Sequence, residues 1–203
     1  EAMKLNNIRV LMIGTDMGSG KMTSGLELFS TAKKDGYKSS FIATGQVGIT
    51  ITGKGIPLDG YKVDHACGAV EKVIMDEKDK ELIVIEGQGS ILHPGSTATL
   101  PLMRGSCPTH MILCHRASAT SLRYPKNILF PDLKKFVKLN EDLVSVCGTY
   151  KSAKVIGIAL NTYHLSKEQA EKEIKRIERD TGIATTDFVR FGASKIWNLI
   201  KKG

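Results

Sequence analysis

The stretch Gly-Thr-Asp-Met-Gly-Ser-Gly-Lys-Met-Thr, residues 14–23, decides the fold class of this chain. It departs in two places from the phosphate-binding pattern G-x-x-x-x-G-K-[ST]. Five residues rather than four separate Gly14 from Gly20, and Met22 stands where a hydroxyl would bind magnesium. An apolar segment, residues 8–13, precedes the stretch, and a helical pattern follows it. We therefore expect a phosphate-binding loop that joins a buried strand to the N-terminus of a helix.

Several features of this loop suit an anionic ligand. Gly18 and Gly20 allow the backbone to curl so that several N–H groups point inward. The following helix adds the positive end of its dipole, and Lys21 adds a point charge. The alternative is a glycine-rich turn without a ligand. The residues expected to bind the cofactor are Gly14, Thr15, Asp16, Gly18, Ser19, Gly20, Lys21, Met22 and Thr23.

Short apolar segments alternate with helical patterns along the rest of the chain. The apolar segments are rich in Val, Ile and Leu without polar alternation, which is typical of strands whose two faces are both covered by helices. They lie at residues 8–13, 40–43, 82–85, 111–114 and 155–160. This alternation predicts one α/β domain over residues 1–203, with a doubly wound, mostly parallel sheet in a three-layer, Rossmann-like architecture.

Local signals mark where some helices begin. Asp64 is expected to cap a helix that runs to about residue 78, residues 131–132 begin another, and Ser166 begins a capping box. The C-terminal residues 193–202 are predicted to form a short helix with Trp197 in the core.

Two segments, 45–63 and 115–131, show no helical or strand periodicity. Both follow predicted strands, at the edge where parallel α/β sheets bind ligands. Connections of this length in a compact domain are usually functional or mobile. We therefore expect both to be long loops near the functional site.

Two further polar residues end predicted strands. Glu86, followed by two glycines, offers a carboxylate to magnesium or to a reacting group, although it could instead cap the sheet edge. Asn161 offers an amide donor and acceptor to a purine edge, although Asn is also a common turn residue. Both residues are therefore candidates for the same site as the glycine loop.

The bulk composition excludes several classes of protein. Hydrophobic residues make up 41% and charged residues 25%, as in ordinary globular proteins. No apolar run approaches the roughly 20 residues of a membrane span, and we expect no secretory signal. The four cysteines form no C-x-x-C pair, so reduced thiols and a cytoplasmic location are expected. A zinc site near residues 107–115 is disfavoured, because Cys114 and His115 point to opposite faces of a strand.

The net charge of +8 is spread unevenly along the chain. Residues 116–138 hold six basic side chains against one acidic side chain: Arg116, Arg123, Lys126, Lys134, Lys135 and Lys138 against Asp132. This segment could be a solvated face, a surface for another domain, or an attractor of an anionic ligand. Nucleic acid is not favoured as a partner, since aromatic residues make up only 6% and do not interleave with the basic ones.

The three strand-end motifs together resemble dethiobiotin synthetase and its P-loop relatives. The loop of that family, G-T-D-x-x-x-G-K-T, has the same five-residue spacing, and its V-E-G-A-G-G motif resembles residues 85–90. The resemblance implies that Asn161 reads the base and that Asp64, Glu86 and Thr23 are candidate magnesium ligands. The metal-binding threonine of the family is Met22 here, which counts against dethiobiotin synthesis itself.

A second resemblance extends over nearly the whole chain. The sequence is similar to the C-terminal P-loop domain of the D-glutamate N-acetyltransferase-like family. The shared motifs are G-T-D-x-x-x-G-K-M-T, A-T-G-Q-x-G-I, E-G-Q-G-S-x-x-H-P, G-I-A-L-N-T and V-R-F-G-A at residues 14–23, 43–49, 86–94, 157–162 and 189–193. Members usually carry an N-terminal Rossmann-like domain, which we expect to be absent from residues 1–203. Such a domain or a second copy of the chain is therefore a candidate partner.

These resemblances lead to three functional hypotheses. The first is transfer of an acetyl group from acetyl-CoA to the amine of a small acidic amino acid such as D-glutamate, with Glu86 or His93 as the base. The second is ATP-dependent activation of a small carboxylate or amine, with magnesium held by Asp64, Glu86 and either Asp16 or Thr23. The third is a non-catalytic nucleotide sensor. Since Met22 is a poor partner for magnesium, the sequence favours acetyl-CoA over ATP as the cofactor.

Overall fold

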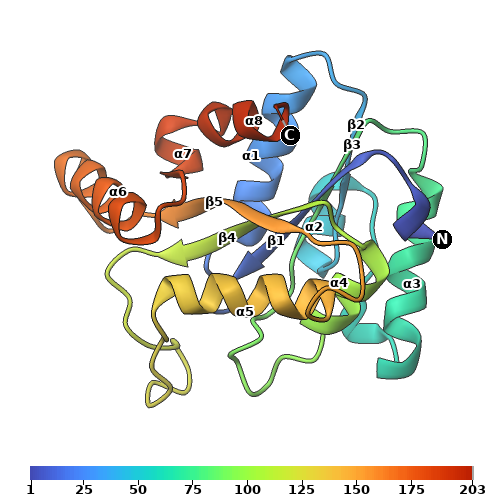
Figure 1. Cartoon of the computed structure of the whole chain (residues 1–203), viewed down its shortest axis with the longest axis horizontal. Helices are drawn as coiled ribbons and strands as arrows, with labels where there is room; N and C mark the ends of the chain where they lie inside the picture. The colour runs from blue at the N-terminus through green and yellow to red at the C-terminus, as the bar shows by residue number, and fades with distance from the viewer. Residues whose placement is uncertain (203) are drawn as a thin grey trace.

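The computed structural model describes residues 1–202, which form a parallel β-sheet covered by helices on both faces (Figure 1). Six strands pair in the order β2-β3-β1-β4-β5-β6, and every pairing is parallel. The strands are β1 (Ile8–Gly14), β2 (Ser39–Ile42), β3 (Leu82–Ile85), β4 (His110–Arg116), β5 (Lys154–Asn161) and β6 (Thr185–Thr186). The five strands predicted from apolar runs are confirmed, with ends that differ by two residues at most.

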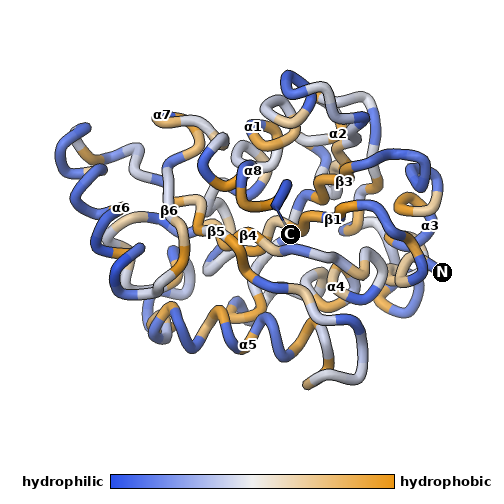
Figure 2. Tube along the Cα trace, turned by 45° about the horizontal axis from the view of Figure 1, so that its top comes forward, coloured by the Kyte–Doolittle hydropathy of each residue, from blue (hydrophilic) through white to orange (hydrophobic). Residues whose placement is uncertain are grey.

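The helices divide into two layers according to the face of the sheet that they cover. One layer contains α1 (Lys21–Lys34), α7 (Phe188–Phe191) and α8 (Ser194–Ile200), and the other contains α3 (Val63–Asp76), α4 (Thr99–Ser106), α5 (Leu133–Ser145) and α6 (Lys167–Thr181). Within β1, Val10 and Met12 pack toward the first layer, whereas Leu11 and Ile13 pack toward the second. The strands are therefore apolar on both faces (Figure 2), and the three-layer α/β prediction is confirmed.

The signals predicted to begin helices have mixed outcomes. The carboxylate of Asp132 accepts a hydrogen bond from Lys135 N at the start of α5, and Ser166 forms the predicted capping box in α6. Trp197 is buried in α8, as predicted. Asp64, by contrast, is not a cap: α3 begins at Val63, so Asp64 lies in its first turn, where its charge still complements the helix dipole.

The segment 45–63 is not the irregular loop that we predicted. It contains α2 (Gln46–Thr52) and a 3-10 turn (Leu58–Gly60). The five β-branched residues of α2 and its single glycine, Gly48, give it low intrinsic helix propensity, which is why its sequence lacks a helical signal. The helix ends at Gly53 with φ of 69°, a left-handed conformation that favours glycine.

Three other elements were not predicted, namely α4, α7 and β6; a short 3-10 turn (Ala2–Lys4) also precedes β1. Pro101 and Gly105 are unusual in helices, so the sequence of α4 does not predict one. The proline lies in the first turn, where it destabilises the helix little. The segment 117–131 is a long connection, as predicted, and Ser121 and Leu129 form an isolated bridge within it.

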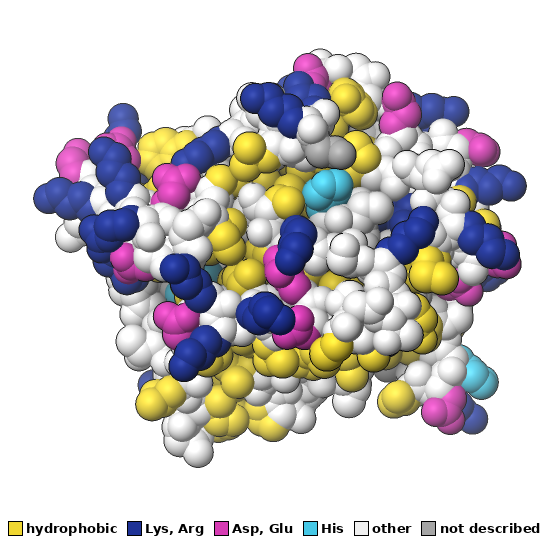
Figure 3. All heavy atoms as spheres, viewed as in Figure 1, with side chains coloured by type: hydrophobic (Ala, Val, Ile, Leu, Met, Phe, Trp, Pro, Cys, Tyr) yellow, Lys and Arg dark blue, Asp and Glu magenta, His cyan; other side chains and the backbone are white. Residues whose placement is uncertain are grey.

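Charged side chains cover the outer surface of α6. On the face seen in Figure 3, Lys and Arg lie beside Asp and Glu over this helix. Arg176, for example, pairs with both Glu173 and Asp180 at helical spacing. These charges compensate one another and give no sign of an anionic ligand there. Among the described residues, none of the helices combines the length and the hydrophobicity needed to cross a membrane.

Candidate functional site

The carboxyl ends of the central strands meet at one edge of the sheet and carry the predicted site. Gly14 at the end of β1 pairs with Cys114 of β4, while Arg116 of β4 pairs with Asn161 of β5. The glycine loop runs from Gly14 directly into α1. Gly18 and Gly20 adopt φ values of 63° and 103°, a left-handed backbone conformation that favours glycine. The predicted strand–loop–helix arrangement is confirmed.

Two side chains within the loop suit a phosphate group. Lys21 is 7% exposed, and its Nζ donates to the carbonyl oxygen of Asp16 at 2.9 Å. Burial lowers the pKa of this lysine. The Oγ of Ser19 is buried beside Gly14 and has no hydrogen-bond partner within residues 1–202. A buried hydroxyl without a partner costs about 1–3 kcal/mol, so a phosphate oxygen in the loop would satisfy both Ser19 and Lys21.

The side of the loop that faces β4 is braced by a buried hydrogen bond. Thr15 Oγ1 lies 2.9 Å from Nδ1 of His115, and the Thr15 carbonyl oxygen accepts from Ser90 Oγ at 3.0 Å. Burial lowers the pKa of His115 to about 4, and the charge of Arg116 adds to this effect. The imidazole is therefore neutral at physiological pH and acts as a fixed partner for the loop.

We expect the neutral His115 to make the protein less stable in acid. Its pKa in the folded state, about 4, is below the ordinary value of 6.5, so the unfolded chain binds the proton more tightly. The stabilising contribution is therefore complete above pH 6.5 and is lost as the pH falls toward 4, by up to about 3 kcal/mol. Urea unfolding of His115→Gln at several pH values should show a shallower acid slope than the wild type. His164→Gln, which removes an exposed histidine, is the control and should keep the wild-type slope.

The carboxylate of Asp16 ties the loop to the end of β4. Its Oδ1 accepts from Met17 N at 2.7 Å, and its Oδ2 accepts from Arg116 Nη2 at 3.0 Å and from Arg123 N at 2.8 Å. Asp16 is 1% exposed. Because both oxygens are engaged, this carboxylate positions neighbouring segments and is a poor candidate for a magnesium ligand.

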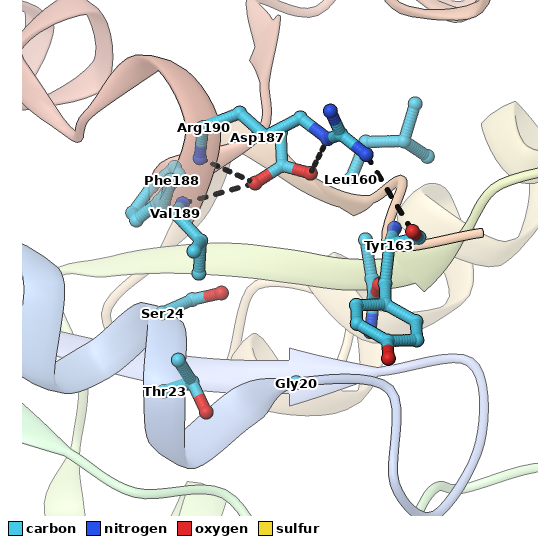
Figure 4. A pocket seen from close by; sticks show the side chains of 10 residues that line it. Gly20, Thr23, Ser24, Leu160, Tyr163, Asp187, Phe188, Val189 and Arg190 are labelled. Carbon is cyan, nitrogen blue, oxygen red and sulfur yellow. Dashed lines mark hydrogen bonds and ion pairs between the residues drawn. The ribbon is translucent and has the colours of Figure 1, made fainter. Parts of the chain in front are cut away.

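A cavity of about 400 Å³ lies where α1 meets the end of β5 (Figure 4). Thr23 and Ser24 of α1 lie on one side, and Tyr163 lies on the other. The Oδ1 of Asn161 accepts from Tyr163 N at 3.1 Å, so this residue does form the turn that we considered as an alternative. Its Nδ2 donates to none of the described residues and remains available to a ligand. The lining residues are Gly20, Thr23, Ser24, Leu160, Asn161, Tyr163, Asp187, Phe188, Val189 and Arg190.

A second cavity, of about 520 Å³, contains Met17 of the loop together with Glu86. The Oε2 of Glu86 accepts from Thr44 N at 2.8 Å and from Gly45 N at 3.2 Å. Its Oε1 has no hydrogen-bond partner in the described part of the chain. Burial raises the pKa of this carboxyl, while the two N–H donors and Lys21 oppose the rise. Glu86 is therefore anchored through one oxygen, while the other is free of protein partners among the described residues.

The other predicted site residues lie in different places. His93 does not line either cavity, and its Nδ1 accepts from Gly95 N at 3.1 Å. Thr23 lines the first cavity, Glu86 lines the second, and Asp64 lines neither, so neither cavity contains all three predicted magnesium ligands. Within residues 1–202, no group of three or more His, Cys, Asp or Glu side chains could hold a metal ion.

One acidic residue of the second cavity escaped the sequence analysis. Asp59 lines the cavity with Glu86, and its Oδ2 accepts from Gln46 Nε2 at 3.1 Å. It lies in the 45–63 segment, whose position at the ligand-binding edge was the available signal. Its carboxylate could not be placed without the fold of α2 and the following turn.

Residues 1–197 match a family described as a domain of unknown function, the DUF1611 C-terminal P-loop domain. The chain belongs to this family. It is 36% identical over 197 residues to a protein from Tritonibacter scottomollicae named D-glutamate N-acetyltransferase, which covers 97% of this chain and 59% of that protein. A protein of the same name from Pseudoalteromonas sp. is 33% identical over 189 residues, which is 93% of this chain and 56% of that protein. The chain thus spans less than two thirds of the length of these relatives.

Solved structures agree with this assignment to the DUF1611 family. A crystal structure of a DUF1611 family protein from Anabaena variabilis is 45% identical and superposes with a TM-score of 0.98, covering 100% of this chain and 59% of that one. Cobyrinic acid a,c-diamide synthase from Mycobacterium smegmatis, solved with ADP and magnesium, is 10% identical with a TM-score of 0.57 over 96% of this chain and 93% of that one. At that identity, the second likeness shows only a shared P-loop fold.

Proposed function

We propose that this DUF1611 domain binds acetyl-CoA through its pyrophosphate and takes part in transfer of the acetyl group to the amine of a small acidic amino acid, such as D-glutamate. The observation that carries the proposal is the placement of two cavities beside one phosphate-type loop. Gly20 lines the first cavity and Met17 lines the second, so both cavities open next to the loop. The names of the longer relatives support the same chemistry.

The first cavity suits the adenosine end of the cofactor. Its volume of about 400 Å³ falls within the usual range for small-molecule sites, and the free Nδ2 of Asn161 offers a donor to a base. The loop between the cavities would hold the pyrophosphate through Lys21, Ser19 and main-chain N–H groups. Because the pyrophosphate is held and not cleaved, Met22 in place of a hydroxyl is no obstacle.

The second cavity suits the acyl end and the acceptor. Glu86 would take a proton from the acceptor ammonium group, which frees the amine to attack the thioester carbonyl. The amide bond forms as the C–S bond breaks, and CoA leaves as its thiol. His93 is a less favoured base, since it lies outside this cavity. Because the named relatives are longer, we propose that a further domain or a second copy completes the acceptor site.

Magnesium-dependent activation with ATP is the second candidate. Two carboxylates, Glu86 and Asp59, line the same cavity as Met17 of the loop, and Mg²⁺ prefers oxygen ligands. Against it stand Met22 in the hydroxyl position and the engaged carboxylate of Asp16. The residues therefore fit a phosphate group better than they fit a tightly held magnesium ion.

Calorimetric titration separates these proposals. We expect acetyl-CoA to bind in the presence of EDTA, and ATP to bind no better when magnesium is added. Release of free thiol from acetyl-CoA upon addition of D-glutamate would then establish transfer. Magnesium-dependent ATP binding without CoA binding would favour the second candidate. Binding of CoA without turnover, both by this chain and by one of its longer relatives, would indicate a sensor.

A further inference from the structure

Arg116 differs from the other basic residues of the 116–138 segment. The other five, Arg123, Lys126, Lys134, Lys135 and Lys138, are exposed. The side chain of Arg116 is only 27% exposed, and its Nε is buried without a hydrogen-bond partner. Since buried polar groups are nearly always paired, such a donor needs an explanation.

Unpaired buried groups concentrate at the glycine loop. Within residues 1–202, the buried side-chain atoms without a partner are Ser19 Oγ, Ser39 Oγ and Arg116 Nε. Ser19 lies in the loop, and Arg116 contacts the loop through Asp16. A hydroxyl and a guanidinium without protein partners at the same loop are both free to donate to a ligand that accepts several hydrogen bonds. An anion with several oxygens meets this requirement.

Asp16 of the glycine loop accepts hydrogen bonds from both Arg116 and Lys21. The side chain of Asp16 accepts from Arg116 Nη2 at 3.0 Å, and its carbonyl oxygen accepts from Lys21 Nζ at 2.9 Å. This shared partner places the guanidinium and the ammonium group beside the same turn of backbone. Arg116 is held by its Nη2 while its Nε donates to none of the described residues, and a planar guanidinium can bind phosphate through two N–H groups at once.

We propose that Arg116 is a second phosphate-binding side chain, which acts with Lys21 on the diphosphate of the ligand while Asp16 positions it. This inference rests on the proposed function, because it requires that the loop bind a phosphate group. It assigns one residue of the basic segment a direct role, and it leaves the exposed residues as general surface charge. CoA and ATP share the diphosphate chemistry, so the test includes both.

The test compares Arg116→Gln with a matched variant, Arg123→Gln. Both remove one positive charge, but the exposed Arg123 contacts Asp16 only through its main-chain N–H, which the substitution keeps. We expect Arg116→Gln to weaken binding of inorganic pyrophosphate and of CoA by about 10- to 100-fold, as for loss of a hydrogen bond to a charged group. Arg123→Gln should change either affinity by less than about threefold, as for an exposed charge that solvent screens. Calorimetry at fixed ionic strength measures both effects.

The outcomes distinguish this inference from the proposed function. If Lys21→Ala abolishes binding but Arg116→Gln binds like the wild type, or weakens binding no more than Arg123→Gln, the role of Arg116 is wrong and the phosphate loop stands. If the wild type binds none of pyrophosphate, CoA and magnesium–ATP, the proposed function fails first. Loss of Arg116 leaves the buried Asp16 carboxylate without its cation, so Arg116→Lys, which keeps a cation beside Asp16 but lacks the planar guanidinium, is the second test. It should keep a thermal midpoint near that of the wild type and still weaken binding of pyrophosphate, whereas wild-type affinity in this variant would contradict binding of the phosphate by the guanidinium.

Discussion

Replacing Lys21 with alanine is expected to lower the affinity for CoA, or for any other diphosphate ligand, by about 100-fold or more. Charge-assisted hydrogen bonds contribute about 1.5–3 kcal/mol each, and the ammonium group of Lys21 can make several to a diphosphate. The structure places this lysine in the loop with its Nζ on the Asp16 carbonyl oxygen, from which it would turn to the phosphate. Isothermal titration with CoA measures the loss directly.

The stability of the Lys21→Ala protein separates a binding role from a structural one. Burial lowers the pKa of Lys21, which means that the fold disfavours its charge. This cost offsets the loss of the hydrogen bond to the Asp16 carbonyl oxygen and of the buried side chain, so removing Lys21 should change the thermal midpoint little. Lys34→Ala is the matched control, because Lys34 is exposed at the far end of the same helix. Normal CoA binding by Lys21→Ala would contradict the assignment of the loop as a phosphate site.

Strands buried on both faces could be predicted from the sequence because they are uninterrupted apolar runs. Runs such as residues 82–85 are apolar without interruption, and these residues form β3, which lies between β2 and β1 and is buried along its whole length. The α2 helix could not be predicted from the sequence, since its β-branched residues and Gly48 favour other conformations and only tertiary contacts make it helical. The local sequence pattern thus predicts strands that are buried on both faces, and it misses a helix that only tertiary packing stabilises.

In the candidate site, too, the residues could be predicted from the local sequence, whereas their tertiary contacts could not. The glycine loop, Glu86 and Asn161 end predicted strands, so the fold class alone was enough to bring them to one edge. The partners of Asp16 could not be predicted in this way. Arg116 is 100 residues away from it, and its pairing with Asp16 depends on the register between β1 and β4. The composition gave only a basic segment, whereas the structure separates one half-buried arginine from five exposed side chains.

Replacing Glu86 with glutamine should reduce acetyl transfer by about 100- to 10,000-fold, the usual contribution of a general base. Binding of CoA should stay close to that of the wild type, because the glutamine oxygen can still accept from Thr44 N and Gly45 N. Glu81→Gln is the matched control. Glu81 is an exposed carboxylate beside the other end of β3, and it likewise accepts a main-chain hydrogen bond, from Lys38 N. His93→Gln tests the competing base, and a loss of transfer confined to that variant would reverse the assignment.

The transfer rate and the folding stability of Glu86→Gln should both depend on pH differently from those of the wild type. A merely structural role of Glu86 would not produce both differences. Burial raises the pKa of Glu86, so wild-type transfer should increase as the pH rises through that pKa, and the residual activity of the variant should not follow this titration. The contribution of Glu86 to folding stability should change with pH in the opposite direction to the transfer rate. A carboxyl whose pKa is raised by folding stabilises the protein when protonated, and this contribution is lost as the pH rises through the folded-state pKa. The variant, which is neutral at every pH, should therefore be more stable than the wild type at pH 7.5, and this advantage should shrink toward pH 4. Equal stability at both pH values would show that the Glu86 carboxyl has an ordinary pKa, which would remove the physical reason for assigning it as the base.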